Sequence, residues 1–244
     1  MTLSIIIPAH NEEEQIEATV RGVLHAVTTP CEVIVVADHC TDRTEDIVKK
    51  IASDDARLRL VRNDQRRGSF SNAIITGLSA AIGEAVVPVM ADHCDDPATI
   101  ERMWQAMQEK NTDVICASRY MKGGRKSGGP VIQNILSRIV SYSLHVLTRI
   151  PTWDCANSYK MYRRAFLLSL PYDIPDAGTE YSMALLFRAY RAGGKIGEIP
   201  TSWQGQAITA GEEWQIFKRF PGYWYWYKKA IERRALREAA SHAD

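Results

Sequence analysis

Two nearly identical acidic stretches, at residues 37–42 and 91–96, most constrain what this chain can fold into. Each opens with Ala-Asp-His-Cys and directly follows an apolar run, at residues 32–36 and 86–90, that is typical of a buried strand. In an open α/β sheet, ligands bind outside the carboxyl ends of the parallel strands. The two stretches are therefore predicted to line one ligand crevice.

Strand-like apolar runs alternate with helical patterns through the first 117 residues. The spacing of Asn11 to Glu14, and of Asp42 to Glu45, is that of a capping box and predicts that helices begin there. The order of elements predicts an α/β fold, a mostly parallel sheet with helices on both faces. The predicted strands cover residues 3–8, 31–37, 58–62, 85–90 and 113–117.

The pattern changes after residue 120. A loop rich in Gly and Lys covers residues 122–129, and residues 131–150 have the spacing of a helix with one broad apolar face. Residues 214–237 combine aromatic residues with Lys and Arg and predict a C-terminal helical extension. Three further segments are predicted to pack over the crevice, at residues 154–164, 180–192 and 196–203.

Composition excludes several classes of protein. With 45% hydrophobic and 24% charged residues, the 244-residue chain is of ordinary globular type, and its net charge of +1 gives no general attraction to nucleic acid. The five cysteines form no Cys-x-x-Cys pair, and no leader-like segment opens the chain, so we expect a reduced, cytoplasmic protein. No run approaches the roughly 20 apolar residues that cross a bilayer.

The turn after the first predicted strand separates the enzyme classes that use such a sheet. It reads Pro8-Ala9-His10-Asn11 and lacks the glycines of a dinucleotide site, and the chain has no phosphate loop of the G-x-x-x-x-G-K-[ST] type. Acidic groups at two strand ends suit a different ligand. They fit a nucleotide whose base is held at one end and whose diphosphate takes a cation at the other.

Several motifs occur in a characteristic order along the chain. Residues 4–12 read Ser-Ile-Ile-Ile-Pro-Ala-His-Asn-Glu, residues 36–44 read Val-Ala-Asp-His-Cys-Thr-Asp-Arg-Thr, and residues 117–120 read Ala-Ser-Arg-Tyr. Residues 154–160 and 178–181 then supply Asp-Cys-Ala-Asn-Ser-Tyr-Lys and Gly-Thr-Glu-Tyr. In this order the motifs resemble those of the family 2 glycosyltransferases of the GT-A fold, most closely the dolichol- or polyprenyl-phosphate mannosyltransferase-like branch.

The resemblance implies transfer of a hexose from a nucleoside diphosphate sugar, linked to UDP or GDP, with inversion at the anomeric carbon. It implies that Glu180 and Asp154 are catalytic and that Arg119 and Lys160 bind the acceptor or its phosphate. Asp38 would contact the base. The implied donor-binding residues are Pro8, Ala9, Asn11, Glu12, Asp38, Gly68, Asn72 and Asp92.

The metal motif departs from the family pattern. Where the family reads M-D-A-D-L-x-x-P, residues 90–97 read Met-Ala-Asp-His-Cys-Asp-Asp-Pro, so that Ala91 takes the place of the first acidic ligand. We expect a divalent cation, Mn²⁺ or Mg²⁺, held by His93, Asp95 and Asp92, and an imidazole ligand favours Mn²⁺. Asp42 and Asp96 are interpreted as helix caps and not as ligands.

The resemblance also implies a division of the chain. Residues 1–120 would bind the nucleotide sugar, residues 121–213 would form the acceptor side of the same domain, and residues 214–244 would form the aromatic and basic helix. That helix either packs on the domain or lies at the inner face of a membrane as a peripheral anchor. The acceptor stays open between a polyprenyl phosphate and another lipid-linked compound, because the family's R-x-x-G-x-S-K motif is missing near residues 199–214.

A second reading of the departures concerns activity. Ala91 and the missing Arg and Lys also suit a nucleotide-sugar-binding or scaffold protein that has lost catalysis. Both readings predict the same nucleotide-sugar crevice. Only an active glycosyltransferase would turn over the nucleotide sugar. The sequence carries no signal for an oligomeric state.

Overall fold

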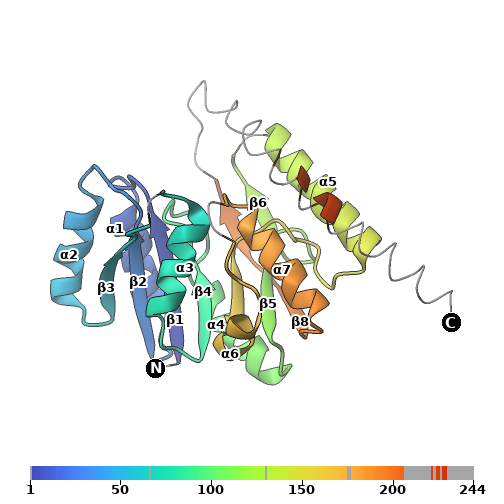
Figure 1. Ribbon diagram of the computed structural model, residues 1–244, viewed down its shortest axis with the longest axis horizontal. Coiled ribbons are helices and arrows are strands. Elements are labelled where there is room, and N and C mark those ends of the chain that lie inside the picture. Colours follow the sequence, from blue (N-terminus) through green and yellow to red (C-terminus); the bar gives the residue numbers. More distant parts are fainter. Residues whose placement is uncertain are drawn as a thin grey trace.

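A central sheet of seven strands is covered by helices on both faces (Figure 1). The computed structural model describes residues 2–65, 67–129, 131–174, 177–205, 221, 224–225 and 227–229. The strands of the sheet are β1 (Leu3–Ala9), β2 (Cys31–Ala37), β3 (Leu58–Arg62), β4 (Ala85–Pro88), β5 (Val114–Ser118), β7 (Lys160–Arg163) and β8 (Ile196–Pro200). A small second sheet pairs β6 (Arg125–Ser127) with β9 (Ser202–Gln204).

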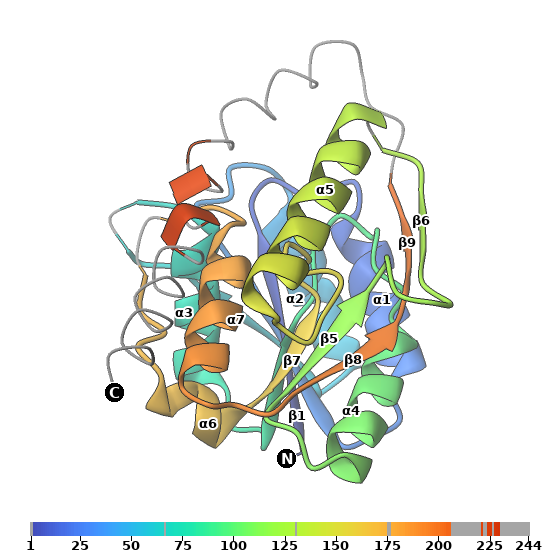
Figure 2. The ribbon, with the colours of Figure 1, turned by 90° about the vertical axis from the view of Figure 1, so that its right-hand side faces the viewer.

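The helices pack in two layers around this sheet (Figure 2). Those of the first half of the chain are α1 (Ile16–Ala26), α2 (Thr44–Asp54), α3 (Phe70–Ala80) and α4 (Thr99–Glu109). The later ones are α5 (Val131–Thr148), α6 (Arg164–Ser169) and α7 (Tyr181–Arg191).

The strand order in the sheet is β3-β2-β1-β4-β7-β5-β8. Every pairing is parallel except those of β7, which runs antiparallel between β4 and β5. The predicted mostly parallel sheet with helices on both faces is therefore confirmed. The sequence did not predict β7 as a central strand, because its four residues begin with Lys160 and end with Arg163 and leave only two hydrophobic residues between them.

Side chains of β1 point alternately into two cores, one on each face of the sheet. Ile5 and Ile7 lie in the core formed with α1, α2 and α4, whereas Ile6 lies in the core formed with α3, α6 and α7. All three side chains are fully buried. Burying each such aliphatic side chain contributes about 1.5–3 kcal/mol to the free energy of folding. Burial on both faces is therefore a main source of the stability of the sheet.

The first two helices begin later than the capping-box spacing predicts. α1 begins at Ile16 and α2 at Thr44, and the residues directly before them, Gln15 and Arg43, make no side-chain cap hydrogen bond. Asp42 Oδ1 does accept the backbone N–H of Thr44 at 3.0 Å, as expected of its predicted role as a cap. Asn11 has a left-handed backbone with φ of 55°, and its Oδ1 accepts the backbone N–H of Thr41 at 2.8 Å. The helix start predicted at Asn11 is wrong because this side chain joins two loops of the crevice instead.

The predicted C-terminal helix, residues 214–244, lies largely outside the described residues. Its described part, at residues 221, 224–225 and 227–229, is helical, and Tyr227 lies against α5 with its hydroxyl 3.1 Å from Ser143 Oγ. In the part of the chain that the structure describes, no helix combines the length and apolar character needed to span a bilayer.

Glu32 of β2 ties three segments together at the end of the sheet opposite the crevice. Its carboxylate accepts hydrogen bonds from Ser4 Oγ at 2.5 Å, from Ile82 N at 2.7 Å and from Arg59 Nη2 at 2.7 Å. Burial by itself would raise the pKa of this carboxyl, but the hydrogen bonds and the Arg59 charge lower it overall.

Glu32→Gln is expected to lower the free energy of unfolding by about 1–3 kcal/mol at neutral pH, because buried donors lose a well-matched acceptor. Since the folded pKa lies below the unfolded value of 4.5, the charge-linked part of this stabilisation is present above that pH. It is lost as the pH falls through the folded pKa. Urea unfolding at neutral and acidic pH measures the difference, and a gap that does not shrink in acid would contradict the prediction.

Candidate active site

The loops after β1 and β2 lie side by side because the two strands are parallel and in register. Ala9 pairs with Ala37, so both strands end at the same edge of the sheet, where Pro8 is half-buried and Ala9 is buried. The backbone N–H of Glu13 donates to Asp42 Oδ2 at 3.0 Å. This bond and the one from Thr41 to Asn11 fix the two loops against each other.

Asp38, directly after β2, is held in one orientation. It is 6% exposed, and its Oδ1 lies 2.7 Å from Asn63 Nδ2 and 3.1 Å from His39 Nδ1. Asn63 is itself buried, and its own Oδ1 accepts the hydroxyl of Thr76 on α3. Asn63 is not among the site residues predicted from the sequence, although its place directly after β3 was a usable signal.

Gly68 brings the loop before α3 onto Asp38. A Cβ at Gly68 would stand 3.0 Å from Asp38 Oδ1, so a side chain there would crowd the carboxylate. Asn72 is buried in the first turn of α3, where its Nδ2 donates to Arg67 O at 2.9 Å. The structure therefore brings Asp38 and Gly68 together, and Asn72 shapes the loop behind them.

Asp92 and Asp95, after β4, form the acidic end of the crevice. Asp95 is buried, and its Oδ2 has no hydrogen-bond partner in the described part of the chain. Burial and the Asp92 carboxylate raise the pKa of Asp95 to about 7, against the opposing effect of the Arg119 charge. Burial and the Asp92 charge also raise the pKa of Glu12, which places Glu12 near this acidic end.

A divalent cation fits two of the three predicted ligands. A buried carboxylate oxygen without a partner, next to a second carboxylate, suits a cation that takes its other ligands from a diphosphate and water. His93 has a left-handed backbone, and its Cε1 lies 3.7 Å from where a Cβ on Gly22 of α1 would stand. Among the described residues, no group of three His, Cys, Asp or Glu side chains is arranged to hold a metal ion. The predicted trio with His93 is therefore not assembled.

Arg119 and Asp154 form a buried, two-pronged ion pair. Arg119 Nε lies 2.7 Å from Asp154 Oδ2 and Arg119 Nη2 lies 2.8 Å from Oδ1, and the Asp154 side chain has no exposed surface. Burial would lower the pKa of Arg119, but the Asp154 carboxylate outweighs it and raises the pKa. The guanidinium also lies within 6 Å of the ring centres of Tyr120 and Trp203.

Lys160 is buried within β7. Its ammonium donates to Cys155 O at 3.1 Å and to Asn157 O, and burial lowers its pKa. Both acceptors belong to the loop that carries Asp154. Lys160 therefore anchors this loop, and its described hydrogen bonds lead to the backbone.

Glu180 directly precedes α7 and is half-buried. Its Oε1 accepts the backbone N–H of Gly178 at 3.1 Å. The segment before it is fixed to α3, because Ala177 N donates to Ser71 Oγ at 2.9 Å and Ser71 N donates to Ala177 O at 3.1 Å. Glu180 is thus held next to the first turn of α3 and the loop that covers Asp38.

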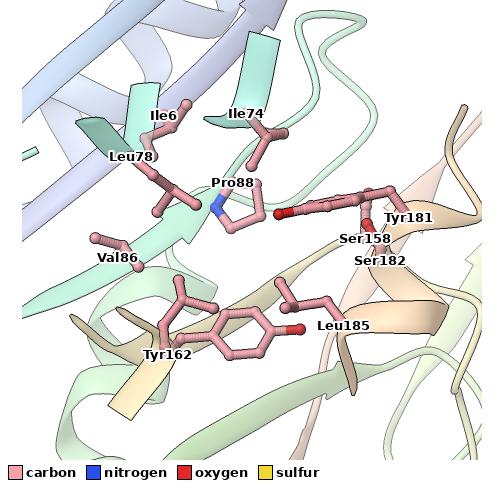
Figure 3. Close-up of a pocket in the computed structure, with 11 residues that line it drawn as sticks. Ile6, Ile74, Leu78, Val86, Pro88, Ser158, Tyr162, Tyr181, Ser182 and Leu185 are labelled. Atoms are coloured by element: carbon pink, nitrogen blue, oxygen red, sulfur yellow. The ribbon is translucent and has the colours of Figure 1, made fainter. Parts of the chain in front are cut away.

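A separate cavity of about 20 Å³ lies inside the core (Figure 3). Its lining is mostly apolar, and the Tyr162 hydroxyl is buried without a hydrogen-bond partner among the described residues. A space of this size holds about one water molecule and no nucleotide. This cavity is therefore not the candidate site, which lies at the carboxyl edge of the sheet with Asp38, Asp92 and Asp95.

Parallel strands that present acidic loops at one edge define an α/β protein with a GT-A-like fold. Residues 4–170 match the family profile described as Glycosyl transferase family 2. The chain belongs to this family.

Two curated relatives illustrate the similarity. The chain is 28% identical to Glycosyltransferase AglD of Haloferax volcanii over 212 residues. This alignment covers 85% of this chain and 34% of that protein. It is 30% identical to a dolichol-phosphate mannosyltransferase of Pyrococcus furiosus over 139 residues. This second alignment covers 57% of this chain and 39% of that protein. The chain spans between a third and two fifths of the length of these relatives.

Solved structures share the fold. Glucosyl-3-phosphoglycerate synthase from Mycobacterium tuberculosis, in complex with Mn²⁺, UDP and phosphoglyceric acid, has a TM-score of 0.73 at 19% identity, covering 95% of this chain and 78% of that one. S. aureus TarS 1–349 has a TM-score of 0.63 at 23% identity, covering 84% and 60%. At these identities the likeness shows the fold alone, and it confirms the predicted GT-A-like class.

Asp154→Ala is expected to lower the free energy of unfolding by about 3–5 kcal/mol, because it leaves the Arg119 guanidinium buried without its partner. As a control, Glu17→Ala removes an exposed pair with Arg21 and should cost no more than about 0.5 kcal/mol. Urea unfolding of both variants measures this contrast. Equal losses would show that the buried pair has no special structural role.

Proposed function

We propose that the protein transfers a sugar from a nucleoside diphosphate sugar to an acceptor oxygen, with inversion at the anomeric carbon. The observation that carries this proposal is one edge of the sheet with a buried carboxylate after each of two parallel strands, Asp38 after β2 and Asp95 after β4. Membership of glycosyl transferase family 2, and the fold shared with a synthase solved with UDP and Mn²⁺, support this donor class.

Asp38 is the group that we assign to the base of the donor. Uracil and guanine both carry an N–H that a carboxylate can accept, so a UDP- or GDP-linked donor suits this position. Asn63 and His39 hold Asp38 Oδ1 and thereby aim the carboxylate. The remaining donor contacts that we propose are Pro8, Ala9, Asn11, Glu12, Gly68 and Asn72.

Asp92 and Asp95 would hold Mn²⁺ or Mg²⁺ beside the diphosphate. When bound, the cation would neutralise charge on the leaving diphosphate. Burying the charge of Asp95 is costly without a partner, and a cation supplies one. Ala91 contributes no ligand, so the site relies on these two carboxylates.

Glu180 is the group that we assign as the general base. Displacement forms the bond from the acceptor oxygen to the anomeric carbon, breaks the bond to the diphosphate, and needs a group that takes the acceptor proton. Glu180 is half-buried and its described hydrogen bond comes from one backbone N–H, whereas both oxygens of Asp154 are bound to Arg119. We therefore assign Asp154 to positioning Arg119 on the acceptor side.

For the acceptor we propose a polyprenyl phosphate or another lipid-linked compound, used at a membrane surface. The similarity to a dolichol-phosphate mannosyltransferase supports this class. The family's Arg and Lys motif is missing from the sequence near residues 199–214, which leaves the kind of lipid-linked acceptor open. A second candidate, a nucleotide-sugar-binding protein without catalysis, is favoured by Ala91, and turnover separates the two.

Release of UDP or GDP from their sugar conjugates in the presence of a polyprenyl phosphate in detergent, measured with and without Mn²⁺, tests the proposal. Glu180→Gln should slow release by about 10²–10⁴-fold with unchanged donor affinity, because it removes the base and not a donor contact. Glu109→Gln, at the exposed end of α4, is the control. Full turnover in Glu180→Gln would contradict the base assignment, and binding without release from any conjugate would favour the second candidate.

Asn63→Ala is expected to weaken binding of the donor nucleotide about tenfold, because Asp38 loses one charge-assisted hydrogen bond worth about 1.5–3 kcal/mol. Thr76→Val removes the other side-chain partner of Asn63 and keeps its bond to Asp38, so its effect on affinity should be smaller. Calorimetric titration of UDP and GDP compares the two variants. Equal affinity of wild type and Asn63→Ala would contradict the role of Asp38.

A further inference from the structure

Helix α5 exposes a stripe of apolar and aromatic side chains. Ile135 is 54% exposed, Ile139 58%, Tyr142 58% and Val146 51%. Their spacing of three or four residues places them on one side of the helix, while Leu144 is buried on the other. Figure 1 shows α5 along the outer margin of the molecule. A continuous apolar stripe of this kind on a surface marks a contact site.

The segment that carries this stripe has charge of one sign, while Glu198 of β8 accepts hydrogen bonds from Thr152 Oγ1 and Trp153 N. No Asp or Glu occurs between Asp113 and Asp154, and the Asp154 carboxylate is already bound to Arg119. The same stretch carries exposed Arg138 and Arg149 on and directly after α5. The helix therefore presents apolar and positive groups together.

Aromatic side chains lie where the apolar stripe meets the positive charges. Trp153 is 38% exposed and stacks on Tyr142 with ring centres 5.8 Å apart. Both residues line a surface pocket of about 370 Å³ that also contains Lys122 and Arg138. Trp and Tyr beside Lys and Arg are the side chains that settle at the headgroup level of a bilayer.

The described C-terminal residues lie next to α5. The contact of Tyr227 with Ser143 fixes this segment against α5, and it adds Trp224 at 47% and Tyr225 at 53% exposure. Lys228 and Lys229 lie over these two rings. The C-terminal segment thus also combines exposed aromatic side chains with positive ones.

We propose that the exposed face of α5 docks on a bilayer that contains anionic phospholipids. The apolar stripe would enter the interface and the Lys and Arg side chains would meet the lipid phosphates. A second copy of this chain fits less well, because a twofold contact would place the same positive charges against each other. The proposal adds a membrane contact to the proposed function. It rests on that function only for the reason why the protein would bind a membrane.

Flotation of the full chain with vesicles of phosphatidylcholine, with and without phosphatidylserine, tests the proposal in the absence of any substrate. We expect binding to the phosphatidylserine vesicles, weakened by NaCl, and at least a tenfold loss of bound protein in the double variant Ile135→Asp and Ile139→Asp. Ile82→Asp, at a 66% exposed apolar position before β4, is the control and should bind as wild type does. Thermal unfolding confirms that each variant is folded.

Two outcomes would overturn the proposal. Undiminished flotation of the folded double variant would place the membrane contact elsewhere in the chain. Absence of flotation in the wild type, with a dimer by light scattering that the double variant loses, would assign the face to a second copy. Because nucleotide release is measured without vesicles, failure of this test and failure of the proposed function are distinguishable.

Discussion

The parallel, in-register pairing of β1 with β2 and β4 is the constraint on which the crevice depends. Ala9 lies opposite Ala37 and Ile6 opposite Pro88, so the three acidic loops leave the sheet at one edge. A register shift of one residue would turn the buried side chains of a strand to the other face, and both cores resist it. The buried pair of Arg119 and Asp154 then fixes the far side of the same edge to the loop before β7.

Charge is segregated over the surface even though the net charge is only +1. Carboxylates gather in the crevice, where Asp92 and burial together raise the pKa of Asp95 and Glu12. Between residues 114 and 153 there is no acidic residue at all. One region thus suits the proposed cation with a diphosphate, and the other suits the proposed contact with anionic lipid.

The parts predicted from sequence are those in which local pattern and tertiary structure agree. β2 and β3 have the predicted bounds, because β2 has a continuous apolar run from Val33 to Ala37 and β3 is a short, mostly apolar segment that ends at the polar residues from Arg62 on. The start of α1 is wrong because a tertiary contact of Asn11 outweighs a local capping signal. β7 and Asn63 were missed for a related reason, since their roles come from neighbours distant in sequence. The exposed side of α5 has the same periodicity as a buried one, so the pattern could not tell them apart.

The most direct test of the account is calorimetric titration of UDP and GDP into wild type and Asp92→Ala, each with and without Mn²⁺. We expect one of the two nucleotides to bind wild type, and Mn²⁺ to tighten this binding by about tenfold or more, equivalent to about 1.4 kcal/mol. Asp92→Ala should keep the affinity measured without metal but lose the increase that Mn²⁺ causes. Equal affinity of wild type with and without Mn²⁺, or an undiminished gain in Asp92→Ala, would contradict it.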